Sequence, residues 1–269
     1  MRTLAQLKNL QDCWALITGG SGHVGQAAAD TLLELGAHVI LLDRNEKCLH
    51  KLHQDTYNNS SRVHTLVCDL ADKQAIVKAM QNVAKIADGK LNILINNAAF
   101  VGTDELTGWC VPFEKQSIDT FNECLNVNLS APFLLSQFAY ELMKKQEFGS
   151  RSIINISSIY GVVGPQMDLY EGTDMGNPAA YAASKAGLMQ LTRWMAPSVA
   201  PHVRVNNIVL GGIERGQPES FFKKYNAKVP LARMATEEDV KGAIAYLSSE
   251  LSNYMTGQSL FLDGGWTVV

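Results

Sequence analysis

The sequence lacks the marks of several protein classes. Its five cysteines are scattered, and no two of them form a CxxC pair: Cys13, Cys48, Cys68, Cys110 and Cys124. An odd number of scattered thiols is typical of a reducing compartment rather than of a disulfide framework or a zinc site, so we expect no metal. The formal net charge is -3, and no Lys/Arg run indicates a surface for nucleic acid.

Long apolar runs are missing as well. No stretch reaches the roughly 18 uninterrupted apolar residues that a membrane-spanning helix requires. The first residues lead into polar ones without the apolar segment of a signal peptide. We therefore expect a cytoplasmic protein with no membrane or nucleic-acid partner. Because no Pro/Gly-rich linker, repeat or low-complexity tract divides the chain, we expect one domain over residues 1–269.

Short apolar runs alternate with longer amphipathic ones. Buried strands are predicted at 13–18, 37–43, 63–68, 91–96, 152–157, 203–210 and 259–262. Helices are predicted over 72–87, with Asp72 as N-cap, and over 114–144, 181–200 and 236–249. Strands that are apolar on both faces belong to parallel sheets covered by helices. The alternation predicts an α/β, single-domain, doubly wound Rossmann fold with a seven-stranded parallel sheet.

Glycines cluster directly after the first predicted strand, in TGGSGHVG at 18–25. Such a turn lets backbone amides approach a pyrophosphate at the positive end of the following helix. Asp43 ends the second strand 18 residues past Gly25, close to the roughly 20 expected for the acid that binds the adenosine ribose. A carboxylate there repels a 2′-phosphate and favours NAD over NADP, although the adjacent Arg44 offers a guanidinium that tolerates this phosphate.

Tyr181 and Lys185 stand four residues apart on a predicted helix, and hence on one face. A free tyrosine titrates near pH ~10, and a nearby cation favours its phenolate. Such a phenol can protonate a carbonyl oxygen as hydride arrives, or accept the proton in reverse. With 8 tyrosines in the chain, the pair alone is a weak signal.

Over its whole length the chain resembles the short-chain dehydrogenase/reductase superfamily, in particular its single-domain branch. The matching segments are the glycine turn, YAASK at 181–185, DL at 69–70, NNAA at 96–99, NVNL at 126–129, ISS at 156–158 and DGG at 263–265. The resemblance implies that Tyr181 is the acid/base and that Lys185 binds the nicotinamide ribose and lowers the pKa of the tyrosine. It also implies that Ser158 holds the substrate oxygen and that Asn128 supports a water-mediated proton path.

The same resemblance implies a set of contacts to NAD or NADP: Gly19, Ser21, Gly22, His23, Val24, Gly25, Asp43, Arg44, Asp69, Leu70, Asn97, Ala98, Tyr181, Lys185, Gly211 and Ile213. Asp69 is expected at the adenine ring, and Asn96 is expected to hold the strand-to-loop geometry. Ser157 and Asn126 are interpreted as structural. Because the family is commonly tetrameric or dimeric, we expect a homo-tetramer or homo-dimer.

Some positions depart from the family pattern. His23 occupies the middle glycine of TGxxxGxG, Leu210 the proline of Pro-Gly, and Ala99 the glycine of NNAG. Ser158 and Tyr181 are 23 residues apart, more than is usual, and the inserted loop at 161–180 either lines the substrate pocket or is a disordered surface insertion. A substrate lid is expected over 211–230, where Arg215 and Lys223 either meet a phosphate or are solvated surface charges.

These patterns predict an NAD(P)-dependent oxidoreductase that acts on a small carbonyl or alcohol. Residues 170–185, 211–213 and 217–221 look like bacterial members associated with surface-sugar or flagellin modification, which favours a sugar or sugar-nucleotide substrate. One alternative is a sugar-nucleotide epimerase or dehydratase, prompted by the glycine spacing, although the chain lacks that branch's extra C-terminal domain. Another is a catalytically silent dinucleotide sensor, which the complete catalytic set argues against.

Overall fold

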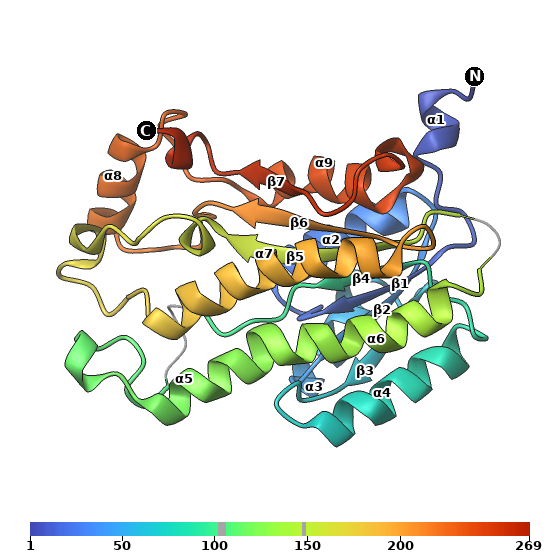
Figure 1. Cartoon of the computed structure of the whole chain (residues 1–269), viewed down its shortest axis with the longest axis horizontal. Helices are drawn as coiled ribbons and strands as arrows, with labels where there is room; N and C mark the ends of the chain where they lie inside the picture. Colours follow the sequence, from blue (N-terminus) through green and yellow to red (C-terminus); the bar gives the residue numbers. More distant parts are fainter. Residues whose placement is uncertain (102–105, 147–148) are drawn as a thin grey trace.

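Seven parallel strands form one sheet in the order β3-β2-β1-β4-β5-β6-β7. The computed structural model describes residues 1–101, 106–146 and 149–269. The strands are β1 (Trp14–Thr18), β2 (His38–Asp43), β3 (Val63–Val67), β4 (Ile93–Asn96), β5 (Ser152–Ser158), β6 (Arg204–Leu210) and β7 (Ser259–Leu262). Each lies on a predicted apolar run, so the predicted doubly wound fold is confirmed (Figure 1).

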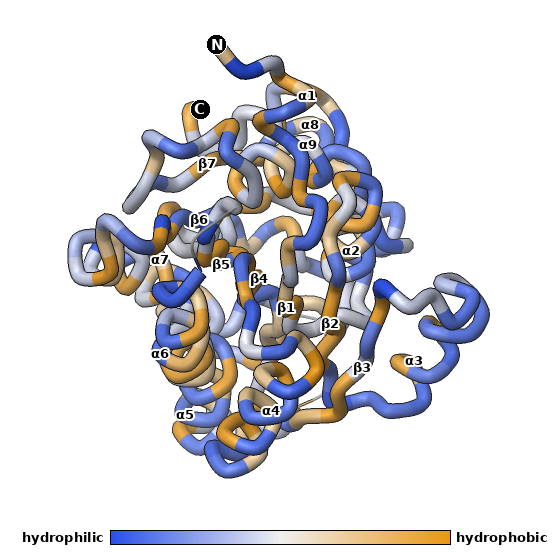
Figure 2. Tube along the Cα trace, turned by 90° about the vertical axis from the view of Figure 1, so that its right-hand side faces the viewer, coloured by the Kyte–Doolittle hydropathy of each residue, from blue (hydrophilic) through white to orange (hydrophobic). Residues whose placement is uncertain are grey.

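Helices cover both faces of the sheet (Figure 1). One layer contains α4 (Lys73–Ile86), α5 (Ile118–Leu125), α6 (Ala131–Met143) and α7 (Ala179–Val199); the other contains α2 (His23–Glu34) and α9 (Glu237–Ser248). Successive strand residues point to opposite faces, so Leu16 packs in the first layer while Ala15 and Ile17 pack in the second. Figure 2 shows the hydrophobic strands between these layers.

Three further α-helices lie in the described part of the chain: α1 (Leu4–Leu7), α3 (Glu46–Lys51) and α8 (Glu219–Lys228). A third apolar cluster, distinct from the two helix–sheet cores, includes Phe221 and Tyr225 of α8, Val209 of β6 and Trp266 near the C-terminus. The rings of Tyr225 and Trp266 stack with centroids 4.6 Å apart. Among the described residues, none of the helices combines the length and the hydropathy needed to cross a bilayer.

Local chemistry fixes most of the helix boundaries. Asp72 caps α4, as predicted, and its carboxylate accepts a hydrogen bond from the Gln74 amide at 2.7 Å. At α9, Thr236 and Asp239 form a reciprocal capping box.

The predicted single helix over 114–144 was wrong. A short 3-10 turn at Phe113–Lys115 comes first, and α5 begins only after the N-cap Ser117. A π-helical turn at Asn126–Ser130 then separates α5 from α6. Pro132 lies at the start of α6 and has no N–H to donate to the carbonyl one turn earlier, so the backbone widens there.

Candidate active site

A cavity of about 770 Å³ opens at the carboxyl ends of the strands, where ligands bind in open α/β sheets. Six consecutive strands of the chain each contribute the residue or turn that follows them. These lining residues are Gly19 after β1, Asp43 at the end of β2, Asp69 after β3, Asn97 after β4, Ser158 at the end of β5 and Gly211 after β6. The sheet therefore gathers residues from positions 19 to 211 along one edge.

The glycine turn at one end of the cavity packs closely against neighbouring backbone, which leaves no room for a Cβ atom. Gly19 has φ +62°, and a Cβ there would lie 2.9 Å from the Ala98 Cα. A Cβ on Gly25 would lie 2.2 Å from the Gly19 carbonyl oxygen. Gly25 itself does not line the cavity and packs against the turn at the start of α2, so its cofactor contact stays a prediction. The other predicted cofactor residues all line the cavity.

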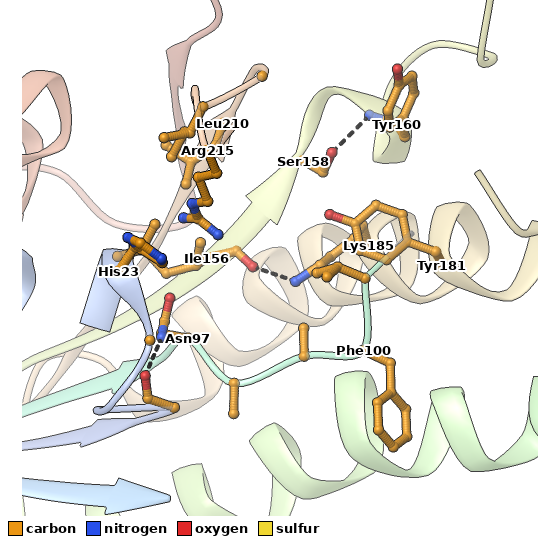
Figure 3. Close-up of a pocket in the computed structure, with 18 of the residues that line it drawn as sticks. His23, Asn97, Phe100, Ile156, Ser158, Tyr160, Tyr181, Lys185, Leu210 and Arg215 are labelled. Atoms are coloured by element: carbon orange, nitrogen blue, oxygen red, sulfur yellow. Dashed lines mark hydrogen bonds between the residues drawn. The ribbon is translucent and has the colours of Figure 1, made fainter. Parts of the chain in front are cut away.

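Asn97 fastens this turn to the end of β4. Its side-chain amide donates to the Thr18 carbonyl oxygen at 3.0 Å and to the Gly19 carbonyl oxygen at 3.1 Å, and Figure 3 shows one of these hydrogen bonds. In return the Thr18 hydroxyl accepts hydrogen bonds from the backbone amides of Asn97 and Ala98. The turn's shape thus depends on a loop almost 80 residues away.

Asp43 lies beside the glycine turn. Its Oδ2 accepts hydrogen bonds from the Ser21 amide at 3.1 Å and from the Ser21 hydroxyl at 2.6 Å. Arg44 is exposed, and its guanidinium carbon lies 5.4 Å from the centroid of the Phe100 ring. A turn that excludes side chains, an adjoining helix N-terminus and a neighbouring acid together fit the diphosphate and adenosine parts of a dinucleotide.

Tyr181 and Lys185 reach the cavity from the first turns of α7. The Lys185 ammonium donates a hydrogen bond to the Ile156 carbonyl at 2.8 Å and lies 5.7 Å from the centroid of the Tyr181 ring (Figure 3). Burial raises the pKa of Tyr181 to about 12, against opposing effects of Ser158 and Arg215. Burial also lowers the pKa of Lys185 to about 8. Desolvation is the largest influence on both groups, and the effect of Lys185 on the tyrosine pKa stays a prediction.

Two adjacent serines end β5 and face opposite ways. Ser158 lines the cavity beside Tyr181, and its hydroxyl accepts a hydrogen bond from the Tyr160 amide at 3.3 Å. Ser157 also borders the cavity, but its hydroxyl is engaged in a 3.0 Å hydrogen bond that it donates to the Lys185 carbonyl. Ser158 is thus available to a ligand, while Ser157 fixes α7 to the sheet, as expected for a structural residue.

Asn128 sits in the π-helical turn, behind the cavity wall. Its Oδ1 accepts from the Phe100 amide at 2.8 Å, and its Nδ2 donates to the Phe100 carbonyl and to the Ser184 hydroxyl, each at 3.1 Å. Both amide hydrogens are thereby used. Asn128 does not line the cavity; it connects the loop after β4 to the helix that carries Tyr181. Its part in a proton path stays a prediction.

A buried chain of polar side chains also anchors α7. Asn96 donates to Asn155 at 2.8 Å, Asn155 donates to Thr192 at 2.7 Å, and Thr192 donates to Asn207 at 3.0 Å. The chain runs from β4 through β5 and α7 to β6. This arrangement supports the expected structural role of Asn96.

Sequence reasoning assigned no role to three polar residues at the other end of the cavity. The Tyr170 hydroxyl donates to the Tyr160 hydroxyl at 2.8 Å. Asn177 is 7% exposed and lines the cavity, and neither polar atom of its amide makes a hydrogen bond of normal length among the described residues. The amide lies near both tyrosine hydroxyls, and this weak hydrogen bonding lowers their pKa, against burial, which raises it. Tyr170 and Asn177 lie in the inserted loop, which lines the cavity rather than forming a detached insertion.

The expected lid region, 211–230, borders the same end. Tyr225 of α8 accepts a hydrogen bond from the Gly212 amide at 2.6 Å. Lys228 pairs with Asp168 of the inserted loop at 2.6 Å. Arg215 lines the cavity, whereas Lys223 does not; the Lys223 side chain is 74% exposed and pairs with Glu219 at 2.7 Å. The two cations that the sequence left open are therefore in different environments.

A doubly wound sheet with a glycine turn, an acid at the end of the second strand and a tyrosine–lysine pair lining the cavity defines the class of dinucleotide-dependent oxidoreductases. A family model described as enoyl-(acyl carrier protein) reductase matches residues 21–267. The chain belongs to the short-chain dehydrogenase/reductase superfamily. It is an NAD(P)-dependent oxidoreductase.

Individual relatives are similar in sequence to this protein over nearly its full length. A tropinone reductase homolog of Arabidopsis thaliana is 33% identical, with 94% of this chain and 89% of that protein covered. Post-translational flagellin modification protein A of Campylobacter coli is 33% identical, with 93% and 96% covered. The latter agrees with the resemblance expected from the sequence.

Two solved structures are similar as well. A short chain dehydrogenase from Leptospira borgpetersenii with bound NAD+ has a TM-score of 0.82 at 33% identity, covering 99% of this chain and 96% of that one. A gluconate 5-dehydrogenase from Burkholderia cenocepacia in complex with NADP and tartrate has a TM-score of 0.85 at 25% identity, covering 99% and 100%.

Proposed function

We propose that this protein interconverts a ketone and a secondary alcohol on a hydroxylated, sugar-like substrate and prefers NAD to NADP. The observation that carries the proposal is that Ser158, Tyr181 and Lys185 line the same cavity as the glycine turn. A substrate carbonyl and a nicotinamide can therefore share one partly enclosed space.

When bound, the nicotinamide supplies or accepts the hydride. Gly19, Ser21 and Asp43 would hold the adenosine and diphosphate parts, and Lys185 the nicotinamide ribose. The Ser158 hydroxyl holds the substrate oxygen, and the Tyr181 phenol donates its proton to that oxygen during reduction or recovers it during oxidation. Burial of Tyr181 keeps this phenol protonated at neutral pH, which suits the reductive direction.

The preference for NAD rests on the Asp43 carboxylate. A 2′-phosphate beside it would meet an uncompensated like charge, because the nearest candidate cation, Arg44, lies over the Phe100 ring. We expect kcat/KM to be higher for NADH than for NADPH, and Asp43→Ala to reduce this ratio by about 10-fold or more. A wild type that favours NADPH would contradict the preference without affecting the oxidoreductase assignment.

The substrate class rests on Tyr160, Tyr170 and Asn177. These groups are uncharged, and each both donates and accepts hydrogen bonds, as a substrate hydroxyl does. Asn177 makes no hydrogen bond of normal length among the described residues, so its amide can accept or donate to a ligand hydroxyl. The names of similar proteins, flagellin modification protein A and gluconate 5-dehydrogenase, agree with sugar-like substrates.

The deciding experiment follows NADH oxidation with keto-sugars, sugar-nucleotide ketones and the matched pair 2-hydroxycyclohexanone and cyclohexanone. Turnover that disappears in Tyr181→Phe supports the reaction; turnover that persists at the wild-type rate contradicts it. Asn177→Leu should lower kcat/KM for the hydroxyketone about 10- to 100-fold and leave cyclohexanone unchanged. Met175→Leu, in the same loop, is the matched control. Equal losses on both ketones would contradict the hydroxyl-binding role.

A further inference from the structure

Three polar side chains, an imidazole, a carboxylate and a guanidinium, meet beside the glycine turn, and the proposed reaction uses none of them. His23 is the first residue of α2, Glu237 is the first residue of α9, and Arg215 lies between β6 and α8. The His23 Nδ1 lies 3.1 Å from the Glu237 Oε1, and the Arg215 Nε lies 3.8 Å from the same oxygen. One carboxylate oxygen of Glu237 therefore lies close to both the imidazole of His23 and the guanidinium of Arg215.

The backbone around Arg215 is fixed on both sides. Ile213 forms a parallel bridge with Ala235, and the Ala235 amide donates to the Gly212 carbonyl at 2.9 Å. The Arg215 amide donates to the Gln217 side chain at 2.7 Å. This bridge places Arg215 close to Thr236 and Glu237, and its side chain extends into the cavity between His23 and Lys185 (Figure 3).

The Arg215 guanidinium has unused capacity to bind an anion. Its side chain is 36% exposed, and burial lowers its pKa, which Glu237 and Tyr181 partly offset. The 3.8 Å approach to Glu237 is too long for a hydrogen bond. Within residues 1–101, 106–146 and 149–269 we find no hydrogen bond donated by this guanidinium. Its five N–H donors form a planar fork that matches phosphate oxygens.

We infer that Arg215 binds the diphosphate of the dinucleotide from across the glycine turn, and that Glu237 holds the guanidinium in place until the dinucleotide binds. The inference rests on the cavity's use of NAD(P). The turn presents backbone amides from one side, and Arg215 presents its fork from another. When a phosphate oxygen replaces the Glu237 oxygen as the partner of Arg215, the guanidinium exchanges one anion for another. His23 stays available to Glu237 at 3.1 Å, so the carboxylate keeps a partner after the exchange.

The test measures binding rather than turnover. The Kd of NADH is measured by fluorescence and that of ADP-ribose by calorimetry, for wild type, Arg215→Leu, Glu237→Gln and the control Lys223→Leu. Arg215→Leu should weaken both ligands by about 10- to 100-fold, the range for hydrogen bonds to a charged group. Lys223→Leu, which removes an exposed cation from the neighbouring helix, should leave both within about 2-fold. Glu237→Gln should bind ADP-ribose at least as tightly as wild type, because it removes a competing carboxylate.

Four outcomes would contradict the inference or the proposed function. Unchanged ADP-ribose binding in Arg215→Leu overturns the inference, as do equal losses in Arg215→Leu and Lys223→Leu, which would indicate a general effect of net charge. A higher KM for a carboxylated ketone with unchanged ADP-ribose binding would assign Arg215 to the substrate instead and also overturn it. Failure of the wild type to bind NADH or ADP-ribose would contradict the proposed function itself. Arg215→Lys, which keeps the charge but not the fork, should lose less affinity than Arg215→Leu.

Discussion

The Lys185 ammonium donates a 2.8 Å hydrogen bond to the carbonyl oxygen of Ile156, two residues before Ser158 on β5. This bond joins the helix that carries Tyr181 to the strand that carries Ser158. The two hydroxyls that would share one substrate oxygen are therefore positioned by the side chain of a third residue. Lys185 is only 4% exposed, so its charge is held at an energetic disadvantage.

Replacing Lys185 should separate stability from activity. Its pKa in the folded protein is about 8, against an ordinary value of 10.5, so below pH 8 the folded state bears a penalty of about 3 kcal/mol. Between pH 8 and 10.5 the unfolded chain binds more protons, and this penalty diminishes as pH rises. Lys185→Met should therefore unfold at a higher temperature than wild type at pH 7, by a margin that narrows by pH 9.5, while turnover is lost. A variant less stable than wild type at pH 7 would contradict this.

Tyr181 should ionise only at strongly alkaline pH in the absence of a dinucleotide. Burial raises its pKa to about 12, so the protonated phenol is retained throughout the neutral and mildly alkaline range. Absorbance titration at 295 nm of wild type against Tyr181→Phe should show no phenolate from this position below pH 10.5. Saturating NAD+ should shift the ionisation to lower pH, because the oxidised nicotinamide ring is positively charged. Detection of the Tyr181 phenolate at pH 8 without NAD+ would show that burial does not control the pKa of this group.

Asn128 should contribute more to stability than its neighbour in the same turn. Asn128→Ala leaves both the amide and the carbonyl of Phe100 without their partner, which should destabilise the fold by about 2–4 kcal/mol. Asn126 is exposed and makes one hydrogen bond to the Ala71 carbonyl at 2.9 Å, so Asn126→Ala should lose less than about 1 kcal/mol. Urea unfolding of both variants measures the difference. Equal losses in the free energy of unfolding would show that the buried hydrogen bonds of Asn128 contribute no more than the exposed one of Asn126.

Gly25 and Gly242 should respond in opposite ways to the same added methyl group. A Cβ at Gly25 would lie 2.2 Å from the Gly19 carbonyl oxygen, whereas at Gly242 it meets no atom within 4 Å. Gly25→Ala should destabilise by about 1–3 kcal/mol or more and weaken NADH binding, because the turn must open. Gly242→Ala, in exposed mid-helix, should stabilise by about 0.5–1 kcal/mol. Thermal unfolding and NADH fluorescence test both; an unaffected Gly25→Ala would contradict the close packing.

The sequence allowed prediction of the sheet because a strand buried on both faces needs a continuous apolar run. The cap at Asp72 was equally local, since its partner Gln74 lies two residues away. The interruption between α5 and α6 was not predicted, because a single π-helical turn of five residues is too short to leave a separate apolar period in the sequence. Only the backbone shows how the chain accommodates Pro132.

In the candidate site, too, some features could be predicted from the sequence and others only seen in the structure. Tyr181, Lys185 and the glycine turn were found from residue type and spacing, because each group is formed by residues within a few positions of one another. The convergence of His23, Arg215 and Glu237 joins three elements that are distant in sequence, and the contact of Tyr160 with Tyr170 depends on the path of the inserted loop. The sequence by itself determined which chemical groups this protein has and the edge of the sheet where they gather. Tertiary structure decided which of them lose water and which meet, because desolvation and long-range contacts depend on every element packed around them; it therefore also set the pKa of Tyr181 well above that of a free tyrosine.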